Sequence, residues 1–76
     1  MTDKKNFYLV NTTTNETRLL AAGVETQQEA GRIQHAILTY TGYKSYYSRI
    51  WYDELNNMWT DFGHYNLFFV WGNLDV

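Results

Sequence analysis

The sequence predicts an α+β fold, a two-layer sandwich in which one helix packs on a mainly antiparallel sheet. The first indication is the spacing of apolar residues. They recur at every second position, change to helical spacing over residues 27–41, and then return to every second position. The second is the placement of turn-forming residues, which divide the alternating parts into hairpins on either side of the helix. The expected order is therefore β-β-α-β-β, followed by a fifth strand.

The length and composition set further bounds on the fold. The 76 residues fit one small domain, and we expect residues 1–76 to form it, with frayed ends over 1–5 and 73–76. The chain contains no cysteine, which excludes disulfides, thiolate metal sites and cysteine nucleophiles. Stability must then rest on apolar packing, extended by self-association where the core alone is too small.

The N-terminal part predicts a hairpin. Residues 7–10 are apolar and aromatic, as in a strand. Residues 11–15 contain only Asn and Thr, whose side chains bond to their own backbone and favour turns. Residues 17–22 can then return as the second strand.

A helix is expected from about Gln27 to Thr41. Thr26 and Glu29 have the spacing of a capping box, in which each side chain accepts a hydrogen bond from a free backbone amide. Gly42 stands where a left-handed residue ends a helix. The apolar stripe expected to face the sheet consists of Ala30, Ile33, Ile37 and Tyr40.

The C-terminal part predicts three strands. Residues 46–54 are rich in aromatic and β-branched side chains, and residues 55–57 form a turn from which 58–62 return. A second turn over 63–66 leads to a fifth strand over 67–71.

More aromatic side chains lie in these strands than one helix can cover. Alternation places Ile50, Met58 and Phe62 on the side that meets the helix. The opposite side remains for binding, because interface cores are enriched in Trp, Tyr and Arg. The predicted binding residues are Tyr47, Arg49, Trp51, Trp59, Phe69 and Trp71.

Two interpretations of this second face remain open. In one, the face is exposed and binds a protein, either a second copy in a homodimer or a larger protein on which the chain docks as an inhibitor or adaptor. In the other, the C-terminal segment 64–76 folds over it as a cover. We favour the first, a small non-enzymatic binding module that acts in protein–protein association.

Single-stranded nucleic acid is the alternative partner for the same face, since bases stack on exposed rings. The formal net charge of −2 and the scattered basic residues argue against it, as do Asp53 and Asp61 beside the rings. The sequence shows no apolar run long enough for a signal peptide or a membrane span, so we expect a cytoplasmic protein with no membrane partner.

Catalytic and metal-binding chemistry has little support in the sequence. Asp61, His64 and Tyr65 lie close together along the chain, but no nucleophile accompanies them. His35 is the only other histidine, so imidazole ligands for a metal are scarce. The sequence therefore predicts no catalytic residue, no metal site and no cofactor.

Overall fold

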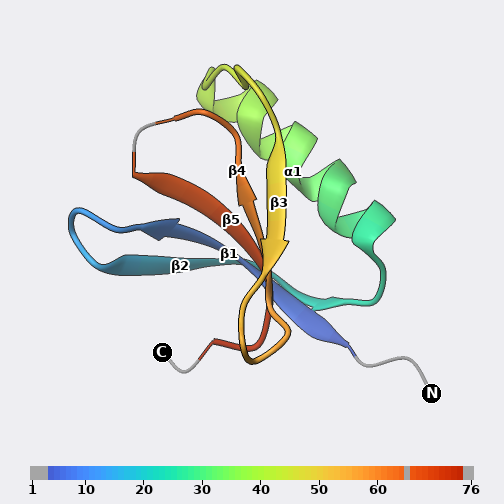
Figure 1. Ribbon diagram of the computed structural model, residues 1–76. Helices are drawn as coiled ribbons and strands as arrows, with labels where there is room; N and C mark the ends of the chain where they lie inside the picture. Colours follow the sequence, from blue (N-terminus) through green and yellow to red (C-terminus); the bar gives the residue numbers. More distant parts are fainter. Residues whose placement is uncertain (1–3, 65, 75–76) are drawn as a thin grey trace.

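The structure, a computed structural model, describes residues 4–64 and 66–74. One helix packs on a five-stranded antiparallel sheet (Figure 1), which confirms the predicted α+β sandwich. The elements are β1 (Lys5–Asn11), β2 (Glu16–Val24), α1 (Gln27–Thr41), β3 (Arg49–Tyr52), β4 (Met58–Asp61) and β5 (Leu67–Gly72).

The order of strands across the sheet is β2-β1-β5-β4-β3, and every neighbouring pair is antiparallel. The hairpins β1–β2 and β3–β4 are each formed from consecutive strands. The last strand, β5, lies between them and pairs with β1 on one side and β4 on the other. β2 and β3 are consequently the two edges of the sheet.

The predicted turns are formed by side chains that bond to the backbone. In the β1–β2 turn, the Asn11 Oδ1 atom accepts hydrogen bonds from the N–H groups of Thr13 and Thr14. Asn15, Asn56 and Asn66 lie in the β1–β2, β3–β4 and β4–β5 turns and have positive φ values of 59°, 64° and 61°. Asparagine tolerates this left-handed conformation better than most residues, which explains its use at all three turns.

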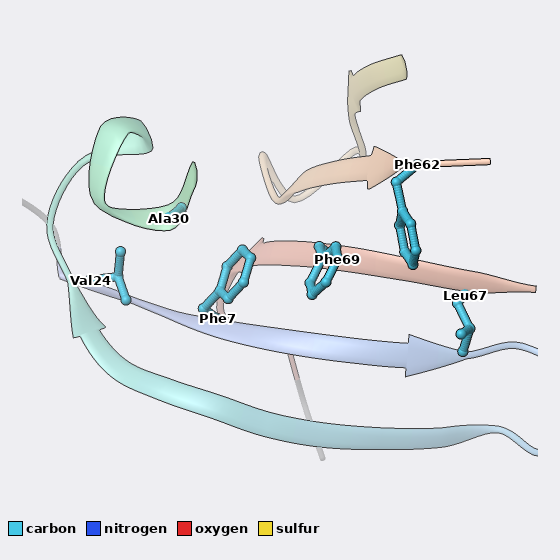
Figure 2. Close-up of a cluster of buried hydrophobic side chains, with 6 residues drawn as sticks. All are labelled: Phe7, Val24, Ala30, Phe62, Leu67 and Phe69. Carbon is cyan, nitrogen blue, oxygen red and sulfur yellow. The ribbon is translucent and has the colours of Figure 1, made fainter. Parts of the chain in front are cut away.

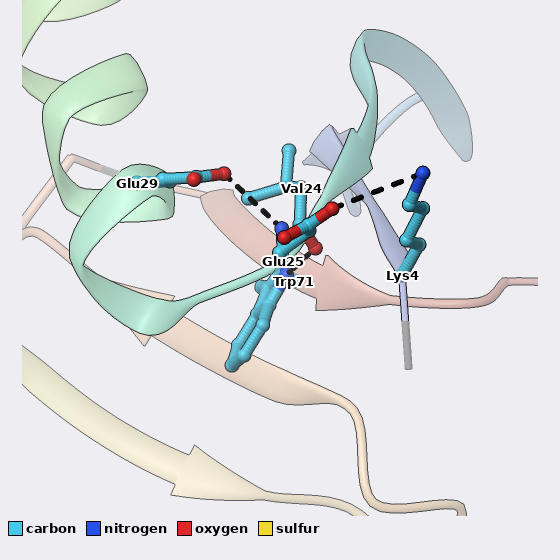
Figure 3. A network of polar contacts seen from close by, with 5 residues as sticks. All are labelled: Lys4, Val24, Glu25, Glu29 and Trp71. Carbon is cyan, nitrogen blue, oxygen red and sulfur yellow. Dashed lines mark hydrogen bonds and ion pairs between the residues drawn. The ribbon is translucent and has the colours of Figure 1, made fainter. Parts of the chain in front are cut away.

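The helix begins and ends as the sequence predicts. The Thr26 hydroxyl accepts a hydrogen bond of 3.1 Å from the Glu29 N–H, while the Glu29 carboxylate accepts one from the N–H of Glu25 rather than of Thr26 (Figure 3). Gly42 has φ 76° and donates its N–H to the Leu38 carbonyl. The two caps therefore each give a partner to one free backbone group at their end of the helix.

The main core lies between the helix and the sheet (Figure 2). The Phe69 ring stacks on Phe7 with 5.4 Å between centroids and lies 4.9 Å from Phe62. All three rings are fully buried. Val24, at the end of β2, and Ala30, in the first turn of the helix, close one end of this cluster, and Leu67 closes the other.

The predicted helical stripe is wrong at its last residue. Ala30 is buried and Ile33 and Ile37 pack on the core, but Tyr40 is 90% exposed and Leu38 packs in its place. At about 100° per residue, Tyr40 and Leu38 point about 80° to opposite sides of Ala30. Ile33 points within about 20° of Tyr40 and still packs on the core, so the contact moves toward the Leu38 side only in the last turns of the helix.

The third strand is shorter than predicted, because its register breaks before Arg49. Arg49 pairs with Asp61, so continued pairing would bring Ser48 opposite Phe62. Instead the Tyr46 N–H donates to the Phe62 carbonyl, which shifts the register by two residues. The segment 43–48 therefore follows β4 without extending the strand.

Parts of the two predicted frayed ends are held by strand pairing or by hydrogen bonds to side chains. Lys5 begins β1, and the N–H groups of Asn73 and Leu74 donate to Asn57 Oδ1 and the Tyr8 hydroxyl. Residues 1–3 and 75–76 lie outside the described residues.

Candidate functional site

The sheet face opposite the helix is built from two cross-strand rows. Register places Trp51, Trp59, Val70 and Tyr8 opposite one another across β3, β4, β5 and β1. The neighbouring row on the same face consists of Arg49, Asp61, Phe68 and Val10.

Three rings of these rows pack together, and we call Trp51, Trp59 and Phe68 the aromatic patch. The two indoles stack with 6.2 Å between centroids and 14° between planes. The Phe68 ring meets both edge-on, at 5.8 Å from Trp51 and 6.0 Å from Trp59. These are favourable geometries for aromatic pairs, so the rings fix one another's orientation.

The aromatic patch lies at the less covered end of this face. Toward β1, Tyr8, Val10 and Val70 form a second buried cluster, and Leu74 packs against it. Toward β3, Trp51 remains 39% exposed. The interpretation of residues 64–76 as a cover is therefore wrong for 67–72, which form β5 within the sheet. Among the described residues after β5, Leu74 packs on this face, at its β1 end.

Asp53 holds the patch from the β3–β4 turn. One carboxylate oxygen, Oδ2, accepts a hydrogen bond of 2.9 Å from the Trp59 indole and a second from the Asn57 amide. The other oxygen accepts the backbone N–H groups of Leu55 and Asn57. The Trp59 bond, followed by the Asn57 backbone bond, holds the pKa of Asp53 below its ordinary value.

Asn57 joins this turn to the end of β5. Its side chain is buried, donates to Asp53 and accepts a hydrogen bond of 2.9 Å from the Asn73 N–H. It lies flat against Gly72, where a Cβ atom would come within 2.0 Å of Asn57 Oδ1. Glycine at this position lets the turn pack onto the neighbouring strand.

Polar groups form the rim of the patch. The Tyr47 hydroxyl donates to Asp61 Oδ2 at 3.3 Å, and the Arg49 guanidinium lies 5.8 Å from the Tyr47 ring centroid. Beside this rim is an open hollow of about 300 Å³. Its lining consists of Tyr47, Asp61, Gly63, His64, Asn66 and Phe68.

The structure brings four of the six predicted binding residues together and separates the other two. Tyr47, Arg49, Trp51 and Trp59 lie on or beside the patch, whereas Phe69 and Trp71 lie on the helix side. Phe69 is fully buried in the main core, and the Trp71 indole donates to the Val24 carbonyl at 3.1 Å (Figure 3). Their placement on the helix-free face was wrong.

Sequence reasoning missed Phe68, which occupies that place instead. Both sides of β5 are apolar, so alternation separates Phe68 from Phe69 without indicating which of them faces the helix. The signal that settles the orientation is the pairing of Phe68 with Asp61 and of Phe69 with the buried Thr60.

The weak catalytic candidate is not assembled by a hydrogen bond among the described residues. Asp61 accepts from Tyr47 and from the Gly63 N–H, while the His64 Nδ1 atom is buried without a partner in that part of the chain. Tyr65 lies outside the described residues. Over residues 4–64 and 66–74, no group of three or more His, Cys, Asp or Glu side chains converges as metal ligands would.

Comparisons with known proteins identified no similar protein. No family model, curated protein sequence or solved structure matches this chain. In the described residues, no helix has both the length and the apolar character needed to cross a membrane.

Proposed function

We propose that this protein is a small non-enzymatic binding module that associates with a protein through the aromatic patch. One observation carries the proposal. Trp51 is 39% exposed on a sheet face that the helix does not cover, and it is packed there against two further rings. Exposed tryptophan beside arginine is typical of the residues that dominate binding energy.

The fixed geometry of the patch supports a binding role. Trp51 stacks on Trp59, which is held by the Asp53 carboxylate, so the rings keep one arrangement before any partner arrives. A surface organised in advance loses less conformational entropy on binding. Exposed side chains that are not held in this way would lose more conformational entropy when a partner binds.

The surroundings of the patch suit a protein surface. Arg49 and Asp61 provide charged groups of both signs at the rim, and the Tyr47 hydroxyl adds a polar group beside them. A polar rim around an apolar centre is the usual anatomy of a protein interface. The partner is either a second copy or a larger protein.

Single-stranded nucleic acid remains the alternative ligand for the same rings. Two features argue against it: Trp51 and Trp59 already stack on each other, and Asp53 and Asp61 place negative charge beside them. A salt-dependent quenching of tryptophan fluorescence by single-stranded oligonucleotides would favour this alternative.

Affinity capture from native lysate, combined with sedimentation of the pure protein, tests the proposal. Wild-type chain and the Trp51→Ala variant are used as baits, with Tyr40→Ala as the matched control. Tyr40 is 90% exposed on the helix, so its loss removes an exposed ring of similar kind at another place. We expect Trp51→Ala to lose the bound protein or the self-association, and Tyr40→Ala to keep it.

The proposal fails if the two variants behave alike. It also fails if two results are obtained together: the pure protein is monomeric, and every protein captured by the wild-type bait is also captured by the Trp51→Ala bait. Circular dichroism of each bait shows whether a lost partner reflects a lost fold.

A further inference from the structure

The edge strand β3 carries the most exposed row of side chains in the sheet. It pairs with β4 alone, and all of Arg49, Ile50, Trp51 and Tyr52 are exposed. Ile50, Trp51 and Tyr52 are consecutive large apolar residues, and both faces of this edge are therefore apolar. An open edge of this kind is a template for pairing with another strand.

The backbone of β3 is oriented for such pairing. The Asp53 N–H donates to the Asn57 carbonyl in the same register that pairs Trp51 with Trp59. Backbone groups of successive residues in an antiparallel pair point alternately toward and away from the partner. Trp51 and Asp53 therefore direct theirs to β4, and Ile50 and Tyr52 direct theirs to the open edge.

The opposite edge of the sheet is less suited to pairing. β2 has register shifts against β1 near Phe7, which twist the strand locally. Leu19 is its one exposed large apolar side chain among the described residues. β3 is short but has no shift within its four residues.

The charges of Arg49, at the start of β3, and Asp53, just after its end, are complementary to the same segment paired antiparallel with a second copy. Arg49 and Asp53 stand two residues before and after Trp51, on the same face. Arg49 forms no ion pair in the described part of the chain. The Asp53 carboxylate is ionised at neutral pH, since even its ordinary pKa of 3.8 lies far below neutrality and its hydrogen bonds lower it further. Each end of the strand thus presents the charge that the other end attracts.

We propose, resting on the function above, that the partner of the aromatic patch is a second copy of this chain. The β3 strands of the two copies pair antiparallel, in the register that places Trp51 of one copy opposite Trp51 of the other. A two-fold axis perpendicular to the sheet then joins two five-stranded sheets into one. Arg49 of each copy lies opposite Asp53 of the other. Ile50 lies opposite Tyr52, and these two residues exchange backbone hydrogen bonds.

The side chains distinguish this register from the neighbouring one centred on Ile50. A two-fold axis at Ile50 would leave the same backbone groups paired but place Arg49 opposite Trp51 and Tyr52 opposite Ser48. The axis at Trp51 pairs opposite charges and brings the two exposed indoles together at a non-hydrogen-bonded position, where side chains approach most closely.

Disulfide trapping tests the register, since the chain contains no cysteine. Ile50→Cys and Tyr52→Cys variants are mixed and oxidised. In the proposed register, the Cα atoms of residue 50 in one copy and residue 52 in the other are about 5.5 Å apart. This distance is within the range of about 4.4–6.8 Å that a disulfide spans. In either variant alone, the like positions are diagonal neighbours at about 7–8 Å. We expect the mixture to give at least fivefold more cross-linked dimer than either variant alone.

A Ser48→Cys and Tyr52→Cys mixture is the matched control, because it cross-links in the register centred on Ile50. Preferential trapping in that mixture overturns the proposed register. Equal trapping in all mixtures also overturns it, since random collisions would then account for the bands.

Sedimentation equilibrium tests the second copy itself. Arg49→Asp places like charges opposite each other at Asp53, and we expect the dissociation constant to rise at least tenfold. Arg32→Asp, the same change at an exposed position on the helix, should leave it unchanged. Equal effects of the two variants contradict the proposal.

The outcomes separate this inference from the function on which it rests. If the wild-type chain stays monomeric and uncross-linked while Trp51→Ala still loses a captured protein, the second copy is wrong and the binding patch stands. If no Trp51-dependent association of either kind is found, both fail.

Discussion

The two faces of the sheet carry the same kinds of side chain but differ in what covers them. Under the helix, Phe7, Phe62 and Phe69 pack ring on ring and are fully buried. On the other face, Trp51 packs against rings in similar geometries yet stays 39% exposed. Ring packing is therefore common to core and surface here.

The difference teaches that aromatic content alone does not identify a core. The helix covers one face, and the second face has Leu74 packed only against its β1 end. Where neither the helix nor Leu74 covers the sheet, the same ring packing produces a rigid exposed surface that can bind a partner. Three tests can break or sharpen this contrast.

Truncation of one ring from each face should give the largest difference. Phe69→Ala removes a fully buried ring, and we expect a loss of about 3–5 kcal/mol in the free energy of unfolding. Trp51→Ala removes a ring that is only partly buried, for which we expect about 1–2 kcal/mol. Urea denaturation at one low chain concentration measures both.

Phe69→Leu is the milder companion variant, with an expected loss of about 1–2 kcal/mol, and it remains measurable if Phe69→Ala does not fold. Equal losses for Phe69→Ala and Trp51→Ala would contradict the contrast between the faces.

Acid should loosen the helix-free face before the core. Because the pKa of Asp53 is lowered in the folded protein, its contribution to stability is fully present above its ordinary value of 3.8 and is lost as the pH falls through the lower folded value. Protonation weakens the bond from the Trp59 indole, whereas the Trp71 indole donates to a backbone carbonyl that does not titrate.

Proton–nitrogen correlation NMR can follow the two indole N–H signals separately. We expect the Trp59 signal to shift with acid while the Trp71 signal stays in place until the protein unfolds. In Asp53→Asn the shift of Trp59 should vanish. Coincident titration of both indoles would mean that acid acts on the whole fold rather than on this face.

The smallest expected effect is a gain on the helix side. Gly31 lies inside the helix, and a Cβ atom there meets no atom within 4 Å. Gly31→Ala should therefore stabilise the protein by about 0.5–1 kcal/mol, because glycine is the more costly residue in a helix. A thermal melt measures it.

Gly42→Ala is its control and should destabilise, since Gly42 has φ 76°. A destabilising Gly31→Ala would show that the helix sits closer to β3 and β4 than the shallow hollow of about 200 Å³ between them indicates.

The features that depended on local chemistry could be predicted from the sequence. The helix begins after Thr26 and ends at Gly42 because both caps act on backbone groups within four residues. The turn asparagines are predictable for the same reason. Trp51 and Trp59 were placed on one face by alternation along neighbouring strands of one hairpin.

What depended on distant pairing could not be predicted. The orientation of β5 follows from its pairing with β1 and β4, and its apolar residues fit either face. Phe68 and Phe69 were therefore exchanged between core and surface. The role of Asp53 was also missed, because its bond to Trp59 depends on how the turn closes.

The central position of β5 has a consequence for how the chain folds. Each hairpin can form from neighbouring residues, but they become one sheet only when β5 enters between them, pairing Gly72 with Asn6 across almost the whole chain. Such distant contacts slow folding. Until β5 enters, the two hairpins share no sheet and the aromatic patch lacks Phe68.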